Sequence, residues 1–312
     1  MIVRAPSWED VPAVLSLARA ADVAVIGDSD WIESDLRAEW KQLDLERDAW
    51  LVELEGALAG YATFTSRGGG RLLGDGYVHP DARGRGVGGE LLRLTEDRAR
   101  LELERIDPAE RVYLQNATLL TEREDCTPRL YEAHGYAPVR HFWRMVVDVD
   151  PAAPSPAAPP PGVELVPYEH PRDARAVHAA QQEAFADHWE HREVPWEEWE
   201  RERFGDDRFD PSLWLLAVDG DEIAGFSLNY WKTGGDWGWI GSIGVRRPWR
   251  RRGIAEALLR ASFAEFARRG ETRVGLGVDG ESPTGATRLY ERVGMRIFWR
   301  AVVYEKELRA GG

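Results

Sequence analysis

The sequence predicts an α/β protein with two similar domains, and three observations lead to this expectation. A stretch that reads as a strand end, a proline-containing turn, a run of arginine and glycine and then an apolar-periodic helix occurs twice, over 78–92 and 245–259. The elements around it follow in the same order in both halves. A proline-rich segment, 151–162, separates the halves and favours an extended spacer. We therefore expect domains over 1–150 and 163–312, joined by this linker.

Composition limits the class of protein. Of the 312 residues, 43% are hydrophobic and 30% are charged, as in a globular protein, and no apolar run reaches the ~20 residues of a membrane span. The net charge of −14 argues against a general affinity for nucleic acid or anionic membranes. A chain start without a long apolar region and a single cysteine, Cys126, favour the reducing cytoplasm.

Periodicity and turn residues predict the elements of the first half. Ser7 and Asp10 form a capping-box start for the first helix, Glu55-Gly56 form a hairpin turn, and Gly135 stops a late helix. The expected helices are 11–18, 30–43, 87–103 and 127–134, and the expected strands are 50–54, 58–64, 72–78, 111–116 and 139–149.

The second half repeats this order. Gly270 and Gly294 stop two of its helices, and a Trp- and Glu-rich segment, 187–209, follows its first helix. The expected helices are 172–186, 253–269 and 284–293, and the expected strands are 163–167, 214–220, 222–228, 237–245, 273–278 and 296–308.

Matching residues define the repeat. Arg83 and Gly86 precede Arg250 and Gly253 by 167 positions. Further along, the sequence Arg-Leu-Tyr-Glu recurs at 129–132 and 288–291, and Phe-Trp-Arg recurs at 142–144 and 298–300. Two copies of one unit, rather than one large domain, explain these matches.

The repeated stretch has the composition of a pyrophosphate cradle. Glycines let the backbone approach a ligand, and the free N–H groups and dipole at a helix start favour a phosphate. Neighbouring arginines add charge-assisted hydrogen bonds. A short Arg/Gly pattern is weak by itself, and its context, a strand before and Leu-Tyr-Glu-x-x-x-Gly later, makes it specific.

With these motifs, both halves resemble the GNAT superfamily of acyl-CoA N-acyltransferases. The resemblance implies a mixed, mostly antiparallel sheet flanked by helices in each domain, acetyl-CoA as cosubstrate, no metal, and an amine acceptor on a small molecule or peptide. It implies that the strand before the cradle binds the pantetheine arm and that the arginine-glycine turn binds the pyrophosphate. The residues carried over are Ile243, Val245, Arg250, Arg251, Arg252, Gly253, Ile254 and Ala255, and in the first half Gly76, Val78, Arg83, Gly84, Arg85, Gly86, Val87 and Gly88.

The resemblance also places a tyrosine in the late short helix, at Tyr290 and Tyr131. Attack of an amine on a thioester expels a thiolate, to which a hydroxyl can donate a proton. The alternative is a packed aromatic side chain whose hydroxyl is bound to a carbonyl group.

An alkyl ammonium must lose a proton before it attacks, so a base is expected as well. The candidates, none of which the pattern singles out, are Asp75, His188, Glu190, His191, Glu193 and Asp236. The family often has an asparagine seven residues before the tyrosine, where this chain has Pro283 and Glu124. This departure puts a coenzyme contact from that turn in doubt.

The sequence therefore predicts a cytoplasmic N-acetyltransferase, a monomer or homodimer, whose second domain is catalytic. An acyl-CoA sensor or structural protein with one or both domains inactive stays open. So does a nucleic-acid binder that uses the arginines of 246–252. Most of the 14 tryptophans are expected in the core, although those before the second cradle could line an acceptor pocket.

Overall fold

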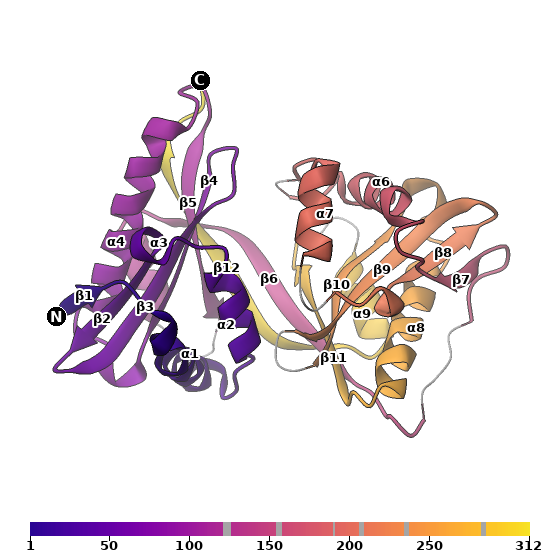
Figure 1. Ribbon diagram of the computed structural model, residues 1–312, viewed down its shortest axis with the longest axis horizontal. Helices are drawn as coiled ribbons and strands as arrows, with labels where there is room; N and C mark the ends of the chain where they lie inside the picture. The colour runs from indigo at the N-terminus through magenta and orange to yellow at the C-terminus, as the bar shows by residue number, and fades with distance from the viewer. Residues whose placement is uncertain (121–125, 154–157, 190, 206–208, 234–236, 282–284) are drawn as a thin grey trace. The chain divides into compact units, whose positions relative to one another are not determined.

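The computed structural model describes residues 1–120, 126–153, 158–189, 191–205, 209–233, 237–281 and 285–312. The chain forms two compact units (Figure 1). The N-terminal unit consists of Met1–Phe142 and Trp299–Gly312, and the C-terminal unit consists of Trp143–Phe298. No helix among the described residues is long and apolar enough to cross a membrane.

The N-terminal unit is a sheet with helices on both faces. Its strands follow the order β1-β2-β3-β4-β5-β12, and β4–β5 is a parallel pair while the other neighbours are antiparallel. Its elements are β1 (Ile2–Arg4), α1 (Val11–Ile26), α2 (Glu33–Trp40), α3 (Leu45–Asp48), β2 (Ala49–Leu54), β3 (Ala57–Ser66), β4 (Arg71–Val78), α4 (Val87–Glu102), β5 (Val112–Leu120), α5 (Cys126–Ala133) and the start of β6 (Ala137–Asp148). The expected capping box is present, with the Ser7 amide 2.8 Å from the Asp10 carboxylate.

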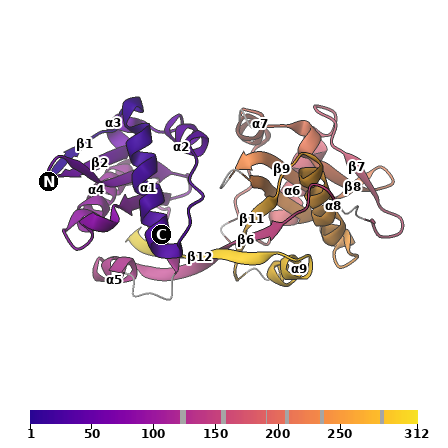
Figure 2. The same cartoon turned by 90° about the horizontal axis from the view of Figure 1, so that it is seen from below.

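Adjacent residues of β3 show how the helices are distributed. A Cβ on Gly60 would meet Val87 and Leu91 of α4, whereas the hydroxyl of Tyr61 accepts a hydrogen bond from Trp40 of α2. Because successive residues of a strand point to opposite faces, α4 and α2 cover opposite faces of the sheet. Figure 2 shows α1 and α2 from below.

The C-terminal unit repeats this plan, with strand order β6-β11-β10-β9-β8-β7. Its elements are β7 (Glu164–Pro167), α6 (Ala174–Phe185), α7 (Trp196–Phe204), β8 (Leu215–Asp219), β9 (Glu222–Thr233), β10 (Trp237–Val245), α8 (Ile254–Arg268), β11 (Arg273–Asp279), α9 (Ala286–Arg292), the later part of β6 and the start of β12 (Arg296–Arg309). Gly225 faces Ile254 and Leu258 of α8, while the next residue, Phe226, lies against Phe185 of α6.

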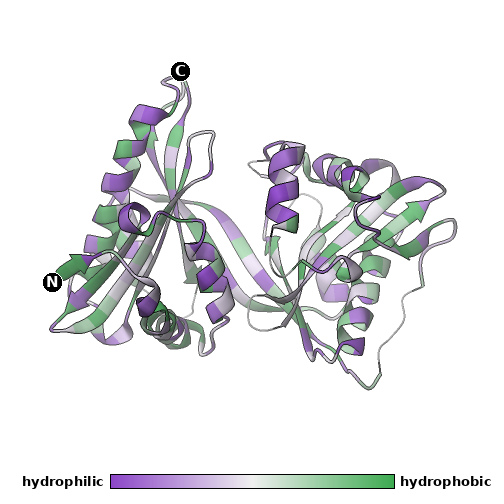
Figure 3. Ribbon diagram, viewed as in Figure 1, coloured by the Kyte–Doolittle hydropathy of each residue, from purple (hydrophilic) through white to green (hydrophobic). Residues whose placement is uncertain are grey.

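The Trp- and Glu-rich segment contains a helix that its composition did not predict. Figure 3 shows α7 as largely hydrophilic, yet its Trp199 is 2% exposed and packs against Trp214, which is fully buried. One buried side chain anchors a helix whose other faces remain solvated. As expected for most tryptophans, these two lie in the core of the unit.

The last strand of the chain lies in the N-terminal unit, whereas the expected division into 1–150 and 163–312 places it in the second domain. Strand β12 pairs antiparallel with β5 of the N-terminal unit, from Arg300 opposite Leu120 to Arg309 opposite Val112. The later part of β6 belongs to the C-terminal unit, where Met145 is fully buried and the amide of Val149 donates to the carbonyl of Thr272.

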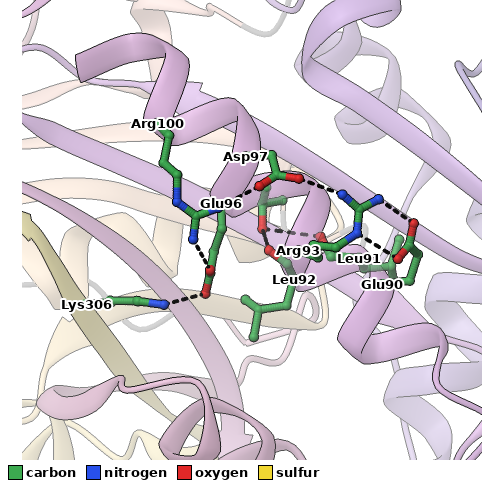
Figure 4. A network of polar contacts seen from close by, with 9 residues as sticks. Glu90, Leu91, Leu92, Arg93, Glu96, Asp97, Arg100 and Lys306 are labelled. Carbon is green, nitrogen blue, oxygen red and sulfur yellow. Dashed lines mark hydrogen bonds and ion pairs between the residues drawn. The ribbon is translucent and has the colours of Figure 1, made fainter. Parts of the chain in front are cut away.

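Polar contacts fix β12 in the N-terminal unit. Figure 4 shows Glu96 of α4 between Arg100, at 2.8 Å, and Lys306 of β12, at 2.9 Å. Arg111 pairs with both Glu305 and Glu307 of the same strand. These residues are far apart in sequence, so the pairing depends on tertiary contacts that a local pattern does not contain.

Candidate cofactor and active site

Both predicted cradles form a turn followed by a long helix. Before α8, Arg251 and Gly253 have left-handed backbone conformations, with φ of 65° and 86°. Before α4, the matching Gly84 and Gly86 have φ of 73° and 84°. The two turns therefore follow the same path. In the second turn, however, Arg251 adopts the left-handed conformation that residues other than glycine rarely populate.

The first amides of these helices are free of intrahelical acceptors. Ala257 is the residue that bonds back to the carbonyl of Gly253, at 3.1 Å, so the amides of Ile254, Ala255 and Glu256 have no partner within the helix. In the N-terminal unit Glu90 bonds back to Gly86, also at 3.1 Å, which leaves the amides of residues 87–89 in the same state. Ideal Cβ atoms on Gly86 and Gly253 would meet nothing within 4 Å. Each turn can therefore accept an anionic group at the helix start.

The strand that leads to each cradle has an edge that is unpaired among the described residues. The parallel pairing of β10 with β11 covers Gly238–Ile240, although β10 continues to Val245 and stays paired with β9. In the N-terminal unit the parallel pairing of β4 with β5 covers Arg71–Leu73. Ile243 and Val245, like Gly76 and Val78, lie beyond these last parallel pairs. Their strand edges can hydrogen-bond an extended ligand in the manner of an added strand.

The two leading strands differ in regularity. Strand β10 has a register shift against β9 between Ile240 and Ser242, which leaves Gly241 as an extra residue, whereas β4 pairs with β3 without a shift. A bulge of this kind redirects backbone groups beside a functional site. A Cβ on Gly241 would lie 2.4 Å from the ring of Tyr230, so only glycine fits this bulge.

The arginines predicted to bind phosphate differ in their side-chain contacts. Arg250 donates to the carbonyls of Val245 and Ala184 and pairs with Asp187 at 3.2 Å, while Arg252 pairs with Asp219. Arg85 pairs with Glu55 in the N-terminal unit. Among the described residues, no contact holds the side chains of Arg83 and Arg251, which remain exposed.

The two tyrosines also differ. The Tyr131 hydroxyl donates to the carbonyl of Ala117 at 3.4 Å. The Tyr290 side chain is 7% exposed, and its hydroxyl forms no hydrogen bond with the described residues. Burial raises the pKa of Tyr290 to about 12, so this hydroxyl keeps its proton at neutral pH. The hydroxyl of Tyr290 can therefore donate a hydrogen bond or a proton to a ligand, whereas the hydroxyl of Tyr131 already donates to the Ala117 carbonyl.

Two carboxylates lie on the α2 side of the N-terminal sheet. Thr63 of β3 is the cross-strand partner of Asp75 in β4, and its hydroxyl donates to Glu39 of α2 at 3.2 Å. Burial, reinforced by the charge of Asp75, raises the pKa of Glu39 to about 7. Partial burial of its carboxyl group raises the pKa of Asp75, against hydrogen bonds from the Gly76 amide and Tyr77. The residue as a whole is exposed, so solvent limits this shift.

Glu39 was not predicted as a site residue. Its position gave a signal, because it lies between Leu36 and Trp40, the two buried residues of α2, on the stripe that faces the sheet. The position of Asp75 in β4 corresponds to Ser242 of β10, counted by the difference of 167. Ser242 accepts a hydrogen bond from Gln181 at 2.8 Å, and Gln181 accepts one from Trp199.

The remaining base candidates are only partly described. Burial lowers the pKa of His188 below its usual 6.5, against the charge of Asp279, and its ring lies 4.3 Å from that of Phe185. His191 and Glu193 follow in the same segment. The candidates Glu190 and Asp236, and the positions Pro283 and Glu124, lie outside the described residues. In the described part of the chain, no group of three His, Cys, Asp or Glu residues is arranged to hold a metal.

Comparison with known proteins identifies the family. A model of the acetyltransferase (GNAT) family matches residues 176–295, and a model of the acetyltransferase (GNAT) domain matches residues 46–138. The chain belongs to the GNAT acetyltransferase family and contains two GNAT domains in tandem. It is an acyl-CoA-dependent acetyltransferase.

Named relatives extend over most of the chain. It is 32% identical to a mycothiol acetyltransferase of Thermobispora bispora over 75% of each chain. It is 31% identical to a mycothiol acetyltransferase of Geodermatophilus obscurus over 93% of this chain and 94% of the relative. A crystal structure of a GCN5-related N-acetyltransferase from Sphaerobacter thermophilus, 38% identical, covers 100% of this chain and 96% of its own with a TM-score of 0.89. These comparisons confirm the predicted family and fold class.

Proposed function

We propose that the protein transfers an acetyl group from acetyl-CoA to a primary amine of a small molecule or peptide, and that the C-terminal unit carries the chemistry. The observation that supports this most directly is the unpaired edge of β10 beyond Ile240, which leads to the free amides at the start of α8. The relatives named acetyltransferases support the general reaction.

The residues present fit this cosubstrate. The edge at Ile243 and Val245 suits the amide groups of a pantetheine arm, and the turn of Arg250–Ala255 suits a pyrophosphate. Acetyl-CoA would supply the acetyl group as a thioester, which a neutral amine attacks with loss of a thiolate. The bulge at Gly241 redirects backbone groups of β10, and we propose that one of its amides would stabilise the charge that develops on the thioester oxygen.

We assign Tyr290 the role of proton donor to the leaving sulfur. Its hydroxyl is protonated at neutral pH and is not engaged by the described residues. For the base we propose His188, because the lowered pKa keeps its imidazole neutral and able to accept a proton at pH 7. Strand β10 carries no carboxylate between Trp237 and Val245 that could replace it.

A second role is favoured for the N-terminal unit by the bond from Tyr131 to the Ala117 carbonyl. With its hydroxyl engaged and β4 free of a bulge, this unit would bind acyl-CoA without transferring the acyl group. The nucleic-acid alternative loses support, because Arg246, Arg247, Arg250 and Arg252 all pair with carboxylates of the same unit.

The names of the relatives suggest a narrower acceptor, the amine substrate of a mycothiol acetyltransferase. We keep this as a narrower hypothesis, which the cysteinyl amines in the panel below test. The single thiol of Cys126 supports our proposal that the protein works in the cytoplasm.

The experiment is an assay of free CoA thiol released from acetyl-CoA over a panel of amines, including peptides with a free N-terminus and cysteinyl amines. We expect acceptor-dependent thiol release for one class of amine. Binding of acetyl-CoA without release over the whole panel would favour a sensor. Absence of any thermal stabilisation by acetyl-CoA would remove the cofactor from the proposal.

A further inference from the structure

Carboxylates at the end of α6 hold the arginines of the second cradle. Asp187 lies 2.5 Å from Arg247 and 3.2 Å from Arg250, and it binds both guanidinium groups at once. One turn earlier, Glu183 pairs with Arg246 at 2.6 Å and accepts from the amide of Arg247 at 3.3 Å. The end of α6 is thus fastened to the turn that we propose for the pyrophosphate.

These two carboxylates are not equally replaceable. Arg246 also contacts Glu222 and the carbonyl of Ile223, so it stays fixed without Glu183. Arg247 has no side-chain partner other than Asp187 among the described residues. Asp187 is the group whose removal would free charge in the cradle.

Among the residues that the structure describes, the N-terminal cradle has no counterpart of this contact. Each cradle forms one ion pair with the neighbouring hairpin turn. The pair is Arg85–Glu55 in the N-terminal unit and Arg252–Asp219 in the C-terminal unit. Arg83, which matches Arg250 in sequence, has no partner in the described part of the chain. The additional carboxylate is therefore a property of the C-terminal unit.

We infer that Asp187 is an internal competitor for the phosphate site at α8, which the phosphates of the cofactor displace from Arg247 and Arg250. The inference rests on the proposed function. Its physical basis is the difference between the two kinds of contact. An exposed ion pair contributes little because water screens it, whereas a phosphate brings more charge and several acceptor oxygens to the same guanidinium groups. The exchange is therefore favourable when the cofactor arrives.

Displacement changes one end of the segment that follows α6. Its far end is held independently, since the Val194 amide donates to Gln182 at 3.0 Å and the Val194 carbonyl contacts His178 at 2.7 Å. Only the end at Asp187 depends on the cradle. Asp187 is thus a positioning residue for the free protein, and it is released in the complex that carries out the reaction.

The test is Asp187→Asn in the full chain, in a Gly86→Glu background that disables the first cradle. Calorimetric titration with coenzyme A in 50 mM salt should show about 3- to 10-fold tighter binding, the size expected for freeing one or two exposed ion pairs. The gain should disappear in about 0.5 M salt, where surface charges are screened. Inorganic pyrophosphate should show the same change on a smaller scale.

Kinetics separate competition from a structural role. Because the charge of Asp187 also acts on His188, the proposed base, the kinetic measurement is the KM for acetyl-CoA, which should fall in Asp187→Asn in parallel with the Kd for coenzyme A. Glu198→Gln is the matched control, since it removes the same charge and an ion pair with Arg192 in the same segment, away from the cradle. It should leave the affinity for coenzyme A unchanged.

Three results would overturn the inference. Weaker or equal binding in Asp187→Asn, with coenzyme A still bound, would show that the carboxylate only supports the turn and would leave the proposed function intact. An equal gain in Glu198→Gln would show an effect of net charge rather than of competition. No binding of coenzyme A in the Gly86→Glu background would remove both the proposed cofactor site in this unit and the inference.

Discussion

The N-terminal and C-terminal units fold the same left-handed turn before a long helix, yet the groups around the two turns differ. The C-terminal unit has a bulge in β10 and a tyrosine, Tyr290, whose hydroxyl forms no hydrogen bond with the residues that the structure describes. The N-terminal unit has a regular β4, a tyrosine bound to a backbone carbonyl, and two carboxylates, Glu39 and Asp75, with raised pKa values. The comparison teaches that one backbone motif can be kept twice while the chemistry beside it diverges.

Disabling each cradle in turn tests which unit carries the reaction. In Gly253→Glu, a carboxylate at the turn would repel phosphate and strain a residue with φ of 86°, so we expect a loss of roughly 10³-fold in kcat/KM. The matched Gly86→Glu should cost less than about 3-fold. Steady-state thiol release measures both variants. A larger loss in Gly86→Glu would place the chemistry in the N-terminal unit.

Strand β12 belongs to the N-terminal unit and the later part of β6 to the C-terminal unit, which predicts the unit that each core residue stabilises. Tyr304 of β12 is 5% exposed and packs 5.3 Å from the ring of Tyr131, so Tyr304→Ala should lower the free energy of unfolding of the N-terminal unit by about 3–5 kcal/mol. Met145→Ala in β6 should destabilise the C-terminal unit by about 2–5 kcal/mol. Hydrogen exchange of β5 and β11 amides separates the two effects. Loss of protection in β11 for Tyr304→Ala would contradict the assignment of β12.

The tyrosines should differ in their effect on rate. Tyr290→Phe removes the proposed proton donor and should lower kcat by about 10²-fold, the lower end of what acid catalysis contributes. Tyr131→Phe should leave kcat within a factor of about 2, because its hydroxyl serves a backbone carbonyl. Single-turnover measurements with saturating acetyl-CoA make the comparison. An unchanged rate in Tyr290→Phe would remove its role as acid.

The smallest expected effect is a pH dependence of the N-terminal unit. The folded pKa of Glu39, about 7, lies above the ordinary value of 4.5 for a glutamate, so the folded state prefers the protonated carboxyl. Stability is therefore greatest below about pH 4.5 for this group, and it falls as pH rises toward 7, by about 1 kcal/mol after allowance for solvent. Glu39→Gln should remove this slope in denaturant titrations at pH 5 and pH 8. An unchanged slope would show that Glu39 is ionised at little cost.

Much of the fold could be predicted, because the relevant signals are local. The capping box at Ser7, the glycines of both turns and the apolar stripes of α4 and α8 each fall within a few residues of the element that they specify. The same holds for the cradle positions, where motif and backbone coincide. Helix α7 was missed, since a single buried tryptophan in a charged stretch gives almost no periodic signal.

The candidate site was less accessible to prediction. Whether a tyrosine hydroxyl is engaged depends on a carbonyl in another element, as for Tyr131 and Ala117. The raised pKa of Glu39 depends on burial and on Asp75, which is 36 positions away in the sequence. The bulge at Gly241 depends on the register of β10 against β9. Each of these is a relation between segments that approach one another only in the folded chain.

By itself the sequence determined the repeat, the two arginine-glycine turns and the family, since all three depend on residue types at short spacing. Tertiary structure decided the exchange of the last strands. Phe-Trp-Arg occurs at 142–144 and at 298–300, and the boundary between the units falls after the phenylalanine in both copies. The shared tripeptide therefore does not say which sheet each strand joins. Long-range contacts, such as those of Lys306 with Glu96 and of Asp148 with Arg273, select the pairing.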